Sequence, residues 1–185
     1  MKLRKEKDSF FINKKKAFTG SPIAKTDIEN AFNFAYEMAL GEGHHRRHRS
    51  GGNESRIPIN IFKNTLQGKL AEIVVYNCFI NNKVICDPVD FSISGEGIWD
   101  DSDLIINDKK ISIKSAVFFS NLLLLEKADW DSNGYYIPNY SAPDLTDKYD
   151  YFILVRIKPN TNSLFNKSKK KGVCYKRNRL SGLAL

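Results

Sequence analysis

The apolar positions along the chain predict two helices in its first half. In residues 26–40 apolar side chains recur every three or four positions, and Thr26 and Glu29 form the Ser/Thr-x-x-Glu capping box that marks a helix start. The glycines that follow this segment predict its end. A second and longer helical stripe predicts a helix over residues 60–80.

The second half of the chain changes to short apolar runs that are typical of strands. We expect strands in "KVICDPVDFSI", "NLLLLEKADW" and "KYDYFILVRIKP", and a hairpin over residues 101–115. The last of these runs is almost continuously apolar, which suits the middle of a sheet. Helices followed by several strands indicate an α/β or α+β fold, with a small mixed sheet flanked by helices.

Both ends of the chain are polar and basic, and they lack a helical or strand period. Each end carries seven Lys or Arg residues, in "MKLRKEKDSFFINKKK" and in "NKSKKKGVCYKRNR". A length of 185 residues with 42% hydrophobic residues suits one domain. We therefore predict a loosely ordered basic arm over residues 1–25, a single domain over 26–160 and a basic tail over 161–185.

The charge balance favours a polyanionic partner. Lys and Arg number 29 against 21 Asp and Glu, a formal net charge of +8. Such a charge attracts nucleic acid through counterion release, so double-stranded DNA is the expected partner. A genome that favours Lys and Asn codons would give the same composition.

Membrane and secreted classes are not favoured by the sequence. No apolar run approaches the length of a membrane span, and the basic N-terminus precedes no signal-peptide core. Cys78, Cys86 and Cys174 make no ligand-spaced or even-numbered set. We expect reduced thiols in a cytoplasmic protein.

A glycine-bounded loop over residues 44–56, "HHRRHRSGGNESR", concentrates basic side chains. A zinc site would need acid or cysteine partners, and the arginines would repel the cation. Contact with DNA phosphates or bases is the favoured interpretation, and a solvated loop is the alternative. The DNA-binding candidates are His45, Arg46, Arg47, His48, Arg49 and Arg56, with His44 beside them.

The hairpin "DSDLIINDKKISIKS" carries charge where a half-buried strand face should be apolar. A two-residue turn at Asp108-Lys109 sets Asp103 opposite Lys114, and a turn one position earlier sets Asp103 opposite Ser112. Because strand side chains alternate, both registers keep Asp103, Ser112 and Lys114 on one face. The acid and the lysine form either an ordinary cross-strand ion pair or a catalytic pair that acts on phosphorus.

Glu72 lies on a less solvated stripe of the second helix. Gly68, Val75 and Phe79, its neighbours at helical spacing, are small or apolar. A carboxylate in such surroundings usually has a cationic partner or a metal ion. The alternative is an ordinary glutamate at the edge of the helix.

The segments "GKLAE", "SDLII" and "ISIKS" together resemble the PD-(D/E)XK nuclease superfamily, the core of many type II restriction endonucleases. The resemblance covers roughly residues 60–157, and "HRRHRSGG" and "YDYFILVRI" are similar less specifically. It implies a restriction-endonuclease-like core that hydrolyses DNA phosphodiester bonds with Mg²⁺. Asp103 and Glu72 would bind the cation with the Ile113 carbonyl, and Lys114 would position the attacking water.

Ser112 departs from the family pattern, in which this position is usually Glu or Asp. Some restriction enzymes of the family show Ser-x-Lys and take the missing carboxylate from elsewhere. Glu72 is the first candidate for that role and Glu126 the second, and Asp100 and Asp101 are further acids near the strand. The predicted catalytic set is Asp103, Lys114, Glu72 and Ser112.

Three functions remain open at this point. The chain is a type II restriction endonuclease that acts as a homodimer, or it is the small nicking subunit of a heterodimeric type IIS enzyme whose larger partner recognises DNA. The third possibility is a basic DNA-binding module without catalysis.

Overall fold

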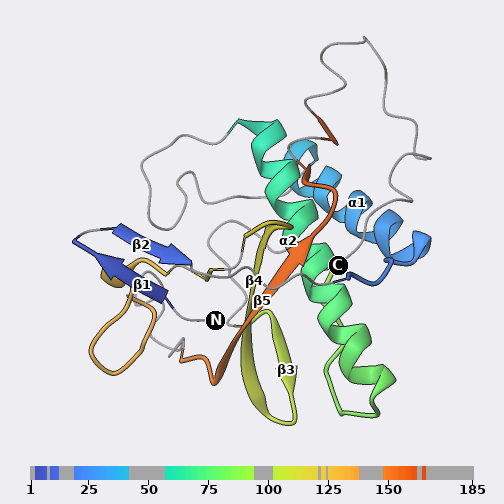
Figure 1. The fold of residues 1–185 in the computed structure, drawn as a ribbon. Helices are drawn as coiled ribbons and strands as arrows, with labels where there is room; N and C mark the ends of the chain where they lie inside the picture. The colour runs from blue at the N-terminus through green and yellow to red at the C-terminus, as the bar shows by residue number, and fades with distance from the viewer. Residues whose placement is uncertain are drawn as a thin grey trace.

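The computed structural model of the chain is a mixed α+β structure (Figure 1). The part of the chain that it describes contains two helices, a three-stranded mixed sheet and a separate two-stranded sheet. The described residues are 3–7, 9–12, 19–41, 57–93, 102–120, 122–123, 125–137, 148–161 and 164–165. The basic loop 44–56 with all its DNA-binding candidates, Asp100, Asp101 and Cys174 lie outside them.

The two predicted helices are present. Helix α1 spans Lys25–Leu40 and helix α2 spans Pro58–Asn81. The predicted capping box is wrong, because the N-cap is Ala24 and Thr26 already lies in the first turn. Proline suits the first position of α2, where its missing N–H would have no helical partner.

Three strands form the main sheet in the order β3-β4-β5. Strand β3 (Leu104–Ile106) pairs antiparallel with β4 (Lys109–Val117), which pairs in parallel with β5 (Tyr151–Ile157). Helix α2 packs against one face of this sheet (Figure 1). The core between them consists of aliphatic side chains, including Leu66, Leu70, Ile73, Leu104, Ile106, Ile111, Ile113, Val155 and Ile157.

The hairpin turn lies at Asn107 and Asp108, both of which have positive φ, 47° and 62°. Two such residues in a two-residue loop are typical of a type I′ turn, whose twist matches the flanking strands. Leu104 pairs with Ile111 at the end of the ladder, and Asp103, just before β3, contacts Ser112 through its side chain. The register with Asp108-Lys109 as the turn is wrong, because Asn and Asp tolerate the left-handed conformation better than Lys.

Two of the predicted strands are absent from the described residues. The segment 83–93 contributes only an isolated bridge from Cys86 to Ile106. In place of a strand, the described residues of 121–130 form a 3-10 helix, η1 (Lys127–Asp129). The Trp130 ring lies 5.4 Å from Phe152 of β5, so this apolar segment packs on the sheet and does not join it.

The basic N-terminal segment contains a hairpin where no regular structure was expected. Strand β1 (Leu3–Glu6) pairs antiparallel with β2 (Ser9–Ile12). The Arg4 guanidinium lies 3.0 Å from the Glu6 carboxylate and 5.8 Å from the Phe11 ring. These cross-strand and same-strand contacts are local, which is why helical or core periodicity did not reveal them.

Two further expectations concern the thiols and the membrane. Cys78 and Cys86 are free cysteines, and burial raises the pKa of the Cys86 thiol, with the Asp87 charge adding to the shift. No helix in the part of the chain that the structure describes has the length and apolarity to cross a membrane.

Candidate functional site

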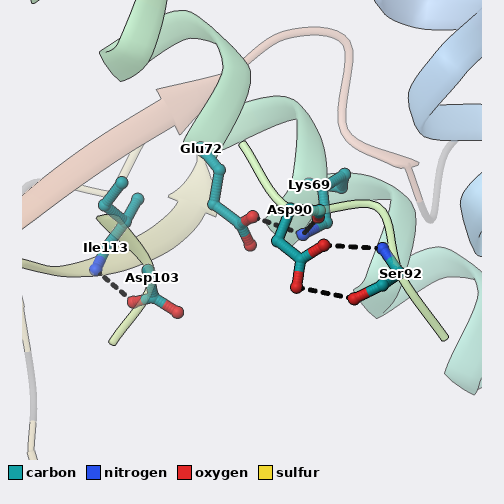
Figure 2. Close-up of polar contacts among 6 residues, drawn as sticks. All are labelled: Lys69, Glu72, Asp90, Ser92, Asp103 and Ile113. Atoms are coloured by element: carbon teal, nitrogen blue, oxygen red, sulfur yellow. Dashed lines mark hydrogen bonds and ion pairs between the residues drawn. The ribbon is translucent and has the colours of Figure 1, made fainter. Parts of the chain in front are cut away.

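The Asp103 carboxylate is anchored to β4 at the open end of the hairpin. Its Oδ2 accepts a hydrogen bond from the Ile113 backbone N–H (Figure 2). It accepts another from the Ser112 hydroxyl at 3.3 Å. The Asp103 backbone N–H donates to the Ile111 carbonyl at 3.2 Å. Within the described residues every hydrogen bond to this carboxylate goes to Oδ2, so Oδ1 is the oxygen that a ligand could use.

Ser112 and Lys114 continue the same face of β4. Ser112 has an exposed fraction of 0% and stands beside Phe152 of β5, while the half-buried Lys114 stands beside Leu154. The ion pairs of the described residues do not include one between Asp103 and Lys114. The ordinary ion-pair interpretation is therefore not observed, because the turn at Asn107 and Asp108 excludes the register that sets Lys114 opposite Asp103.

Glu72 has a cationic partner one helical turn earlier. Lys69 Nζ lies 2.5 Å from Glu72 Oε2, and the side chains are only 8% and 16% exposed. Lys69 also donates to the Asp90 carbonyl at 2.8 Å, and its Nζ lies 4.6 Å from the centre of the Phe34 ring. The expectation that this poorly solvated carboxylate has a partner is met by a lysine within "GKLAE" itself.

Glu72 and the face with Ser112 and Lys114 lie on opposite sides of the sheet. Helix α2 packs on the face of β4 that carries Ile113, and alternation turns Ser112 and Lys114 the other way. Glu72 and Asp103 can therefore meet one ligand only at the end of the sheet. In the view of Figure 2 the Glu72 carboxylate lies between the Asp103 side chain on one side and the Lys69 side chain on the other.

The cation ligands that the sequence predicts are oxygen donors, the kind that a hard cation such as Mg²⁺ prefers. No group of three or more His, Cys, Asp or Glu side chains in the described part of the chain could hold a metal ion. Mg²⁺ is usually bound through one or two carboxylates with several waters and substrate phosphates. Asp103, Glu72 and the Ile113 carbonyl offer only oxygen donors of this kind.

The remaining acids have other surroundings. Glu126 is exposed just before η1, where its carbonyl accepts a hydrogen bond from the Asp129 N–H at 3.1 Å. The Asp90 carboxylate accepts hydrogen bonds from the N–H and hydroxyl of Ser92, both at 2.7 Å (Figure 2). These hydrogen bonds lower the pKa of Asp90, and the Lys69 charge adds to the effect.

Sequence analysis did not find Lys69 or Asp90 as members of this site. The spacing of three residues between Lys69 and Glu72 is a signal for an ion pair on a helix, and it is present in the sequence. The contact with Asp90 joins residues 21 positions apart, and no pattern in the sequence indicates it.

Comparison with known proteins gives no match: no protein-family model, no curated protein and no solved structure matches the chain.

Proposed function

We propose that the protein is a Mg²⁺-dependent DNA endonuclease, and specifically a type II restriction endonuclease. The observation that carries the proposal is the Asp103 carboxylate, held to β4 through Oδ2 alone, with Lys114 on the same strand face. A small mixed sheet preceded by two helices supports it, because the resemblance to PD-(D/E)XK nucleases implies this order.

In this proposal Asp103 and Glu72 hold the cation, with the Ile113 carbonyl as a further ligand. Bound Mg²⁺ supplies positive charge against the scissile phosphate and makes a coordinated water more acidic. Lys114 orients the attacking water and stabilises the negative charge that develops on the phosphoryl oxygens. Ser112 keeps the Asp103 carboxylate in its orientation through its hydroxyl hydrogen bond.

The substrate is held by the basic parts of the chain. A net charge of +8 supports binding to the DNA backbone, with the loop over residues 44–56 as the main contact. Two assemblies fit this function, a homodimer that cuts both strands and a small subunit that nicks one strand beside a larger recognition subunit.

Incubation with supercoiled plasmid tests the proposal. The protein should convert plasmid to nicked or linear form with Mg²⁺ and not with EDTA, and Asp103→Asn should reduce the rate by about 10³-fold or more. Cleavage that persists in EDTA or in Asp103→Asn would contradict the proposal.

Light scattering on the same samples separates the two assemblies. A dimer that linearises plasmid without another protein supports the homodimer, and a monomer that only nicks supports the small subunit. DNA binding without cleavage in the presence of any divalent cation would support the third alternative, a DNA-binding module without catalysis.

A further inference from the structure

Lys69 is a buried cation with two hydrogen-bond acceptors and two aromatic neighbours. It is 7% exposed, and its Nζ contacts Glu72 Oε2 at 2.5 Å and the Asp90 carbonyl at 2.8 Å. The centres of the Phe34 and Phe91 rings lie 4.6 and 5.6 Å from Nζ. The ammonium is thus fixed by α1, α2 and the segment that follows α2.

Stability alone does not account for a lysine at this position. Burying both charges has a desolvation cost that often equals or exceeds their attraction, and an apolar residue would pack between two phenyl rings without it. A lysine in such surroundings is better explained by its effect on the group it binds, which is the Glu72 carboxylate.

The same lysine connects the helix of Glu72 with the strand that follows Asp103. The Asp90 carbonyl that it binds belongs to a segment fixed by the two hydrogen bonds from Ser92 to the Asp90 carboxylate. This segment is joined to β3 by a hydrogen bond from the Asp87 N–H to the Ile105 carbonyl at 3.0 Å. Lys69 therefore constrains both the orientation of Glu72 and the position of α2 relative to β3.

We propose that Lys69 is a positioning residue for the divalent-cation site, which sets the Glu72 carboxylate relative to Asp103 by holding Oε2. The inference rests on the proposed function, because it concerns the same two cation-binding carboxylates. Partners that orient metal ligands typically contribute 10- to 100-fold to metal affinity or activity, which sets the size of the expected effect.

Binding of Mn²⁺ alone, measured by isothermal titration calorimetry in the absence of DNA, tests the inference. Lys69→Met, which keeps the length of the side chain without its charge, should raise the Kd for Mn²⁺ about tenfold or more. Lys69→Arg should recover most of the affinity. Lys63→Met is the matched control, a lysine on the same helix that is 8% exposed, and it should leave the Kd unchanged.

Circular dichroism shows whether each variant folds. If Lys69→Met is unfolded, Lys69→Gln replaces it, since it keeps a hydrogen-bond donor, and it should also raise the Kd. A folded Lys69 variant without charge that binds Mn²⁺ like the wild type overturns the inference, as does an equal loss in Lys63→Met.

A double variant shows whether Lys69 acts through Glu72. In a Glu72→Gln background, Lys69→Met should weaken Mn²⁺ binding little further, and a full additional loss would contradict the proposed route. If Asp103→Asn abolishes Mn²⁺ binding while Lys69→Met does not affect it, only this inference fails. If the wild type binds no Mn²⁺, or if Asp103→Asn leaves Mn²⁺ binding unchanged, the proposed function fails with it.

Discussion

Ser112 is completely buried and donates its hydroxyl hydrogen to Asp103 Oδ2 across the hairpin. An acid at this position, as in most PD-(D/E)XK nucleases, would place a second buried carboxylate beside Asp103, and like charges at that distance repel. Serine instead supplies a donor and orients the carboxylate. Serine at this position therefore has a local physical role, which is to orient the Asp103 carboxylate.

Removing that donor should have a measurable cost. Ser112→Ala leaves one fewer hydrogen bond to Asp103 and should lower the free energy of unfolding by about 1 kcal/mol, measured by urea denaturation. Its cleavage rate should fall less than that of Asp103→Asn, because the Ile113 N–H still holds Oδ2. Wild-type stability in Ser112→Ala would contradict the role given to the hydroxyl.

The Asp90 carboxylate offers a second test at a single residue. The hydrogen bonds from Ser92 lower the pKa of Asp90, so their stabilisation is present above the ordinary carboxyl pKa and is lost as pH falls through the lowered value. An NMR titration of the Ser92 amide should have a midpoint below about 3.9, the ordinary Asp value. Ser92→Ala should raise the Asp90 midpoint, and an unchanged midpoint in that variant would contradict the assignment.

The elements with long apolar patterns were predictable, and those set by local backbone preferences were not. Helix α2 and strand β5 follow from sustained periodicity and from a continuous apolar run. The hairpin was predictable as an element, and both registers of its turn stayed open, although the tolerance of Asn and Asp for positive φ favours the observed turn at Asn107 and Asp108. The run that ends at Trp130 was expected to be a strand, but Trp130 packs its ring on Phe152 of β5, and composition cannot separate that role from a strand.

The candidate site was predictable to the same extent. Alternation predicted that Asp103 and Ser112 lie near each other, and the Ser112 hydroxyl does donate a hydrogen bond to Asp103. The spacing of Lys69 and Glu72 could have indicated their ion pair, whereas the contacts of Lys69 with Phe34 and Asp90 come from tertiary packing alone and could not be foreseen.

Glycine substitutions test the position of the turn. Asp108 has a φ of 62°, so Asp108→Gly creates the Asn-Gly pair favoured in type I′ turns and should raise the free energy of unfolding by about 0.5 to 1 kcal/mol. Lys109→Gly places glycine in β4 and should lower it by about the same amount. Urea denaturation of both variants decides the register, because a turn at Asp108-Lys109 predicts stabilisation by Lys109→Gly.

Across the whole molecule, the packing of α2 on the sheet determines how the candidate site is assembled. The helix covers the face of the sheet that carries Ile113, and the Lys114 side chain lies on the other face. Asp103 lies at the end of β3, where the two faces meet. The account therefore depends on Lys114 acting beside Asp103 on a bound phosphate and not as a surface charge for DNA attraction. Lys109, which is exposed on the same strand and pairs with Asp150 at 3.4 Å, is the matched comparison.

The most direct test is Mg²⁺-dependent cleavage of supercoiled plasmid by Lys114→Ala and Lys109→Ala, with DNA binding of both measured by gel shift. We predict that Lys114→Ala cleaves at least about 10³-fold more slowly than the wild type and binds DNA nearly as well, while Lys109→Ala cleaves normally. Equal cleavage by the two variants, or a loss in Lys114→Ala explained by lost DNA binding, would contradict the account.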